Sequence, residues 1–138
     1  MGKFFWIVIV AVLAAGTYFS VHAYKTLRNT PERITQTFVQ DLEAGNTDRA
    51  YERLSADLKK GREQYWKDFI AQFKAHEGEA TLASQEYVDD TFNTYPTDSE
   101  PQRFVYKLRM QGKDYVLQIV TYKIQNVWII GELLGSYK

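Results

Sequence analysis

The 138-residue chain contains no cysteine, only three prolines and only two histidines. Without cysteine it forms no disulfide, and it offers no thiolate as a nucleophile or zinc ligand. The zinc-binding pattern HExxH, the calcium-loop pattern DxDxDG and a glycine-rich phosphate loop are also absent. These absences argue against a dedicated metal site, and the sequence predicts no cofactor.

Neither sign of charge dominates, because 17 basic side chains balance 17 acidic ones. A balanced chain creates no long-range field that would attract nucleic acid, so no nucleic-acid partner is expected. The most basic stretch holds only Lys59, Lys60 and Arg62, without interleaved aromatic residues. Such a short stretch is more typical of a solvated bend between helices than of a nucleic-acid site.

A long uncharged run is confined to residues 4–24. Twenty-one helical residues would extend about 31 Å, which matches a bilayer core of about 30 Å. The run therefore predicts a membrane anchor with lipid as a partner. A cleaved signal peptide is the alternative, with Lys3 before the apolar stretch and residues 21–23 as the cleavage site. The predicted anchor residues are Phe4, Phe5, Trp6, Ile7, Val8, Ile9, Val10, Val12, Leu13, Tyr18 and Phe19.

Both interpretations of this run carry the rest of the chain across the membrane. Both predict an extracytoplasmic domain, periplasmic or at the cell surface in a bacterium, and a retained anchor makes the chain a single-pass membrane protein. Small residues in the run could allow a second membrane helix to approach closely, or could simply face lipid. These residues are Ala11, Ala14, Ala15 and Gly16.

Three helical patterns follow a short linker at residues 25–29. The first begins at Thr30-Pro31, with threonine as the N-cap and proline in the first helical position, and ends at Gly45-Asn46. The second covers residues 47–58, and the third runs from residue 62 to 77, where Gly78 stops it.

After Gly78 the apolar period changes from about four to two, which indicates strands. Residues 81–95 predict a long strand or a bent pair, and residues 103–111, 115–125 and 127–134 predict an antiparallel meander. Residues 94–102, which hold two prolines, predict an exposed loop.

Helices followed by an antiparallel sheet predict an α+β fold. We expect an anchor and linker at residues 1–29, then an extracytoplasmic domain at residues 30–138. In this domain three helices pack on a curved sheet, which gives a cone whose wide end could hold a small apolar ligand. The residues expected to line the cone are Trp66, Phe69, Phe73, Tyr106, Tyr115, Gln118 and Tyr122.

Several motifs resemble the nuclear-transport-factor-2-like, or cystatin-like, superfamily and its small anchored bacterial domains. They are the helix Phe38–Leu42, the turn Gly45-Asn46, the helix around Ala50-Tyr51, and the strand Asn126–Gly131 with its tryptophan. The resemblance covers residues 30–135 and rests on packing and turn motifs. It implies the cone fold, which hosts isomerases and dehydratases as well as non-enzymatic secretion components, so it does not select a function.

The candidate acids and bases do not form a catalytic group. His22 falls in the apolar run, His76 is expected to cap the end of the third helix, and neighbouring Asp89 and Asp90 would point to opposite faces of a strand. We therefore expect no catalytic residue and a non-enzymatic binding or scaffold module, an accessory component of a membrane or envelope protein complex. The alternative is a small-ligand binder or an enzyme of the cone type.

Overall fold

The computed structural model describes residues 29–88 and 101–138. Four α-helices and one 3-10 turn precede the sheet: α2 (Pro31–Glu43), α3 (Thr47–Glu52), α4 (Ala56–Lys59), α5 (Glu63–Ala71) and η1 (Gln72–Ala75). Helix α2 begins at the predicted proline and buries one stripe, which includes Thr35, Phe38, Val39 and Leu42. This stripe is the part of α2 that packs on the sheet. Its burial stabilises the helix, because most of a helix's stability in a protein comes from packing of its apolar face.

The second predicted helix is interrupted at Leu54, so the prediction of one helix over residues 47–58 was wrong. Leu54 forms an isolated parallel bridge with Ile130, and the Ser55 N–H donates to the Ile130 carbonyl at 3.0 Å. The Ser55 hydroxyl then accepts from the Leu58 N–H at 3.1 Å and caps α4. Tertiary pairing and a local cap thus override the continuous helical pattern.

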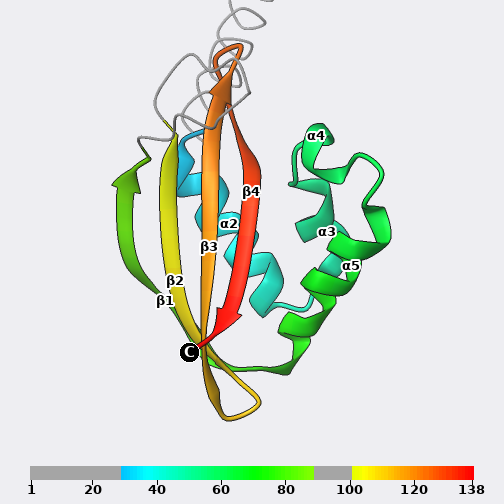
Figure 1. Cartoon of the computed structure of the whole chain (residues 1–138), viewed down its shortest axis with the longest axis vertical. Helices are drawn as coiled ribbons and strands as arrows, with labels where there is room; N and C mark the ends of the chain where they lie inside the picture. Colours follow the sequence, from blue (N-terminus) through cyan, green and yellow to red (C-terminus); the bar gives the residue numbers. More distant parts are fainter. Residues whose placement is uncertain (1–28, 89–100) are drawn as a thin grey trace, which may run out of the picture. The chain divides into compact units, whose positions relative to one another are not determined.

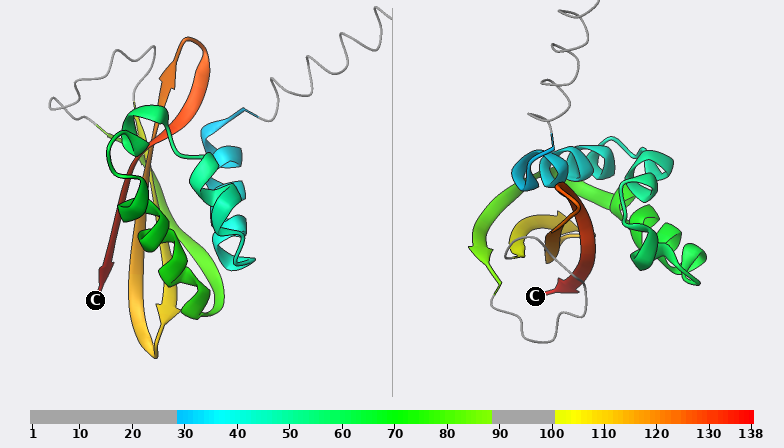
Figure 2. Two further views of the ribbon diagram at one scale, coloured as in Figure 1. Left: turned by 90° about the vertical axis from the view of Figure 1, so that its right-hand side faces the viewer. Right: turned by 90° about the horizontal axis from the view of Figure 1, so that it is seen from above.

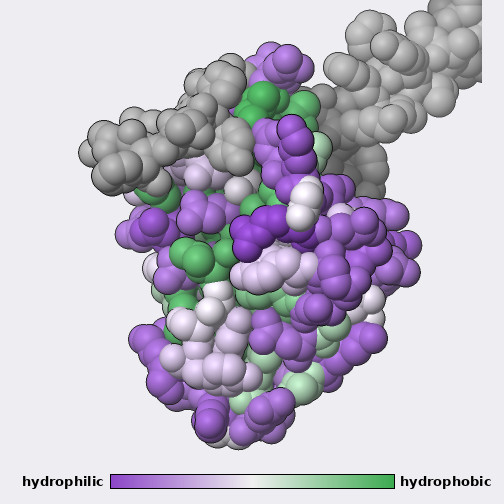
Figure 3. Space-filling model, turned by 45° about the vertical axis from the view of Figure 1, so that its right-hand side comes forward, coloured by the Kyte–Doolittle hydropathy of each residue, from purple (hydrophilic) through white to green (hydrophobic). Residues whose placement is uncertain are grey.

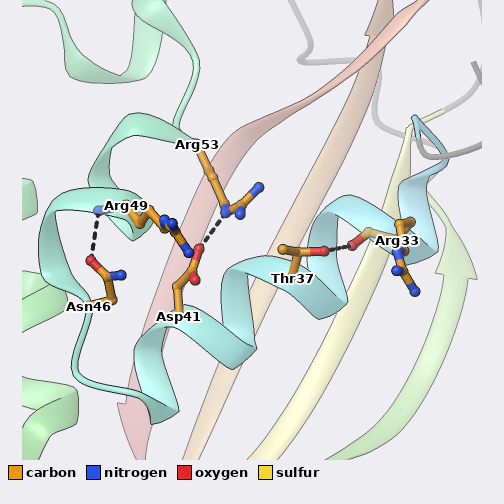
Figure 4. A network of polar contacts seen from close by, with 6 residues as sticks. All are labelled: Arg33, Thr37, Asp41, Asn46, Arg49 and Arg53. Atoms are coloured by element: carbon orange, nitrogen blue, oxygen red, sulfur yellow. Dashed lines mark hydrogen bonds and ion pairs between the residues drawn. The ribbon is translucent and has the colours of Figure 1, made fainter. Parts of the chain in front are cut away.

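An ion pair joins α2 to the segment after α3 (Figure 4). Arg53 donates from Nε to the Asp41 carboxylate, which is almost fully buried. The turn between the helices is held by the Asn46 side chain, which accepts from the Arg49 N–H. These contacts fix the position of α3 on α2.

The sheet is an antiparallel meander in the order β1-β2-β3-β4 (Figure 1). Its strands are β1 (His76–Tyr87), β2 (Gln102–Met110), β3 (Lys113–Ile124) and β4 (Val127–Tyr137). The regular register of β2 on β3 contrasts with two register shifts in β1, between Glu77 and Thr81 and between Leu82 and Ser84. The meander was predicted, but β1 starts earlier than expected.

The third predicted helix was too long. Its last α-helical residue is Ala71, and a 3-10 turn leads directly into β1, where His76 pairs with Met110 and Glu77 with Arg109. Gly78 therefore lies inside the strand, with a φ of +73°. Its left-handed conformation is one that glycine adopts without steric cost, and it falls at the first register shift.

The helices and sheet enclose one hydrophobic core, and Figure 2 shows α2 lying along one face of a curved sheet. Phe38, Ile70, Phe73 and Phe104 are among its fully buried side chains. Alternate residues of β2 and β3 contribute to this core, as period two requires.

The predicted fold class is corrected in two respects. Within the described residues, four α-helices stand where three were expected. In addition, no helix within residues 29–88 and 101–138 is long and apolar enough to cross a membrane. The predicted span at residues 4–24, with its anchor and helix-contact residues, lies outside the described residues.

Candidate functional site: an acidic groove between α2 and β1

A groove of about 500 Å³ lies between α2 and the edge strand β1. This volume is within the range of about 300–1,000 Å³ typical of ligand sites. Its apolar surface comes from both layers, and its polar surface comes mainly from one side of α2. The lining residues are Val39, Ala80, Leu82, Phe104 and Tyr106, together with Glu32, Gln36, Gln40, Glu43 and Glu79.

Three carboxylates line this groove, and none of the ten lining residues is lysine, arginine or histidine. Glu43 Oε1 accepts a hydrogen bond from the Ala80 N–H at 3.3 Å, which ties α2 to β1. Glu32 Oε1 accepts from Gln85 Nε2 at 2.8 Å. Each carboxylate retains further acceptor capacity, so the groove has a negative potential suited to a cation.

Tyr106 gives the groove a polar group at its floor. It is only 7% exposed, pairs with Leu82 and Leu117 on the neighbouring strands, and lines the groove beside Glu43. The ring is buried, whereas the hydroxyl opens into the groove and is not a buried polar atom that lacks a partner. Burial, and then the Glu43 carboxylate, raise the pKa of Tyr106. A phenol hydroxyl that opens into a largely apolar groove is a polar group by which a ligand could be oriented.

Three of the predicted cone-lining residues, Trp66, Phe73 and Tyr115, lie in the core, and a fourth, Phe69, packs against it. Trp66, Phe69, Phe73 and Tyr115 make successive edge-to-face contacts, each with ring centroids 5.5 Å apart. The Trp66 indole N–H donates to the Leu58 carbonyl at 2.7 Å. The void beside Phe73 measures only about 10 Å³, roughly the limit for a single water. These rings fill the space that the cone hypothesis assigned to a ligand.

Two further predicted lining residues lie on the other face of the sheet. Gln118 and Tyr122 alternate with the core residues of β3, and Gln118 pairs with Val105 and Leu134. The Tyr122 ring covers Gly131. They cannot line a cavity together with Tyr115, because residues an odd number apart in a regular strand face opposite sides. Of the seven predicted residues, Tyr106 is the one that lines the acidic groove.

The other sequence candidates do not form a reactive group. His76 begins β1, and its Nδ1 lies 2.7 Å from the Phe73 carbonyl oxygen at the end of the 3-10 turn. His22, Asp89 and Asp90 lie outside the described residues. Within residues 29–88 and 101–138, no three histidine or acidic side chains are grouped to hold a metal ion.

The basic stretch lies around the turn from α4 to α5. Its charged side chains make cation–π contacts with nearby aromatic rings. Lys59 Nζ lies 5.2 Å from the centre of the Tyr51 ring. The Arg62 guanidinium lies 4.3 Å from the centre of the Tyr65 ring. Contacts of this kind support a structural role for the stretch.

The groove residues on α2 were not predicted, although their spacing was visible. Glu32, Gln36, Gln40 and Glu43 are separated by four, four and three residues, which places them along one side of a helix. A uniformly polar stripe beside the apolar one is ordinary for a surface helix. Only the approach of β1 turns the stripe into the wall of a groove.

No protein-family model matches the chain, and no curated protein matches it. Among solved structures, it is similar to the crystal structure of a DUF4783 family protein from Bacteroides uniformis. The two superpose with a TM-score of 0.53 at 16% sequence identity, over 80% of this chain and 98% of the other. At this identity the similarity shows a shared fold, and the proposed relationship to the nuclear-transport-factor-2-like superfamily stays a prediction.

Proposed function

We propose that this domain is a non-enzymatic binding module whose acidic groove docks a protein partner. The observation that carries the proposal is a groove lined by three carboxylates and no basic side chain, into which the Tyr106 hydroxyl opens beside Glu43. A basic side chain of the partner would supply the opposite charge and could also donate a hydrogen bond to the phenol.

The chemistry of the groove favours arginine or lysine as the docked side chain. Both have an apolar stem and a charged end, and they commonly bury the stem while the end remains polar. Val39 and Phe104 provide an apolar surface for the stem, and Glu43 and Glu79 provide acceptors for the end. Arginine would gain more than lysine, since its planar donors can bind a carboxylate and the phenol together.

A protein segment fits this position better than a free amine because the groove runs beside an edge strand. β1 pairs only with β2 among the described strands, so its other edge is open to a further strand, apart from Ala80, whose N–H already donates to Glu43. An extended segment can add to such an edge through main-chain hydrogen bonds while alternate side chains enter neighbouring pockets. The glutamates of β1 would then favour a basic segment.

The alternative of a small apolar ligand has less support. The aromatic rings expected to surround it fill the core, and the void there is about 10 Å³. The predicted extracytoplasmic location and a role in an envelope complex stay predictions.

Calorimetric titration of the full-length protein tests the proposal. The probe is a capped pentapeptide that alternates valine with arginine, and its control has glutamate in place of arginine. We expect saturable binding of the arginine peptide alone, weakened by salt because the contact is between opposite charges. Equal binding of both peptides would refute the proposal.

Matched charge substitutions locate the binding. Glu43→Gln and Glu79→Gln should each weaken the arginine peptide about fivefold, which corresponds to about 1 kcal/mol per lost ion pair. Glu52→Gln makes the same change in net charge on the exposed surface of α3, outside the groove, and should leave the affinity unchanged. Equal losses in all three variants would indicate a nonspecific charge effect.

A further inference from the structure

A smaller hollow, the second pocket, adjoins the acidic groove further along β1. Its volume is about 200 Å³, and its lining residues are Glu32, Gln85, Glu86, Tyr87 and Gln102. Glu32 also lines the acidic groove, so the groove and the second pocket adjoin at this residue. At the same point Gln85 Nε2 donates to Glu32 Oε1 at 2.8 Å, which joins β1 to α2.

The second pocket lies on the same face of the sheet as the groove. Gln102 of β2 lines the second pocket, whereas Phe104 and Tyr106 line the groove. These three residues alternate along β2, so their side chains point to one face. Tyr87 of β1 pairs with Gln102, and Leu82 of β1 pairs with Tyr106. The second pocket and the groove are therefore four residues of regular strand apart, or about 13 Å.

The lining of the second pocket suits a cation with a flat charged group. Two of its five lining residues are carboxylates, and none is basic. Glu86 Oε1 already accepts from Arg103 Nη1 at 3.2 Å, so the charge of Glu86 is partly balanced. The aromatic ring of Tyr87 is 70% exposed beside these carboxylates. A guanidinium can stack on such a ring while its N–H groups donate to a carboxylate, which favours arginine over lysine here.

The geometry points to a docked segment that carries two arginines four positions apart, one in the groove and one in the second pocket. This inference rests on the proposed function, because it requires that a basic protein segment docks along β1. Residues four apart in an extended segment point to the same face and lie about 13 Å apart, which matches the separation of the two sites. The residues between them would pass over the hydrogen bond from Gln85 to Glu32.

Isomeric peptides test this spacing. Two capped nonapeptides of identical composition carry two arginines among threonine and valine, four positions apart in one peptide and three apart in the other. Only the spacing of four places both arginines on one face of an extended chain. In calorimetric titration of the full-length protein, that peptide should bind at least about fivefold more tightly, as expected for an added cation–π contact.

The possible failures of this experiment are distinguishable. Saturable binding of both peptides with equal affinity would overturn the inference and leave the proposed function standing. If neither peptide binds, the proposed function is wrong, and the inference is wrong with it.

Substitutions of Tyr87 locate the second arginine. Tyr87→Leu removes the aromatic ring and should reduce the preference for the spacing of four to less than about twofold, whereas Tyr87→Phe keeps the ring and should retain the preference. Glu52→Gln is the control for general charge effects and should also retain it. Its helix, α3, lies beyond the edge of the sheet opposite β1, on the mainly hydrophilic side that Figure 3 brings forward. A preference that Tyr87→Leu leaves unchanged would overturn the assignment of the second pocket.

Discussion

Replacing Gly135 with alanine tests how closely β4 packs against the aromatic core. A Cβ at this position would overlap the hydroxyl oxygen of Tyr115 and lie 2.6 Å from its Cζ. The Tyr115 ring has little room to move, because it is 3% exposed and lies between Phe73 and Tyr137 at centroid distances of 5.5 Å and 5.0 Å. The cost comes from overpacking alone, since Gly135 has no left-handed φ.

Overpacking in a rigid core costs about 1–3 kcal/mol, and the short contacts place this substitution at about 2–3 kcal/mol. For a domain of this size the loss should lower the melting temperature by roughly 10–15 °C. Urea unfolding at low protein concentration measures the free energy and avoids any contribution from association.

A double-mutant cycle identifies the cause of this loss. In a Tyr115→Leu background the ring is absent, so Gly135→Ala should cost less than about 1 kcal/mol. If Gly135→Ala costs less than about 0.5 kcal/mol in the native background, or if the two substitutions are additive, the close approach of Tyr115 to β4 is wrong.

Three further predictions concern charge. Glu43→Gln should lower the pKa of Tyr106, because the Glu43 carboxylate contributes to raising it. The titration can be followed by ¹³C NMR of the tyrosine Cζ atoms. An unchanged pKa would show that Glu43 does not affect the ionisation of Tyr106. Arg53→Ala should destabilise the fold by about 2–3 kcal/mol and Asp41→Ala by about 1 kcal/mol, since only the former leaves a buried charge unpaired; equal losses in urea unfolding would contradict this. Burial raises the pKa of Tyr115 to about 12, so the unfolded chain ionises first as pH rises. The contribution of Tyr115 should then hold below pH 10 and fall by about 3 kcal/mol towards pH 12. Tyr115→Phe should reduce the alkaline loss of stability without abolishing it, because the pKa of Tyr106 is also raised.

The sequence predicted elements where local signals and tertiary packing agree. Pro31 fixed the start of α2, and alternation in residues 103–111 predicted β2 and its buried face. Prediction failed where a distant contact decides. The bridge from Leu54 to Ile130 interrupts a helical pattern, and the pairing of His76 with Met110 converts the expected end of a helix into the start of a strand.

The positions of the predicted cone-lining residues relative to one another could not be read from the sequence for a related reason. Aromatic residues were predictable as inward-facing, but a sequence does not show whether the space between them is filled. Trp66, Phe73 and Tyr115 contact one another, whereas Tyr106 reaches the edge of the core where α2 and β1 separate. The groove depends on how closely α2 approaches β1. The two elements are joined by the hydrogen bond between Glu43 and Ala80, which are 37 residues apart in the chain.

The measurement that tests the central claim most directly is the position of a bound arginine side chain on the full-length protein. Isotope-filtered NMR of the complex with the arginine pentapeptide detects which protein protons lie close to the arginine methylenes. Docking in the groove predicts contacts to the ring of Tyr106 and to the methyl groups of Val39 and Leu82. Contacts confined to other surfaces, with none to Tyr106, would contradict the assignment of the groove as the docking site.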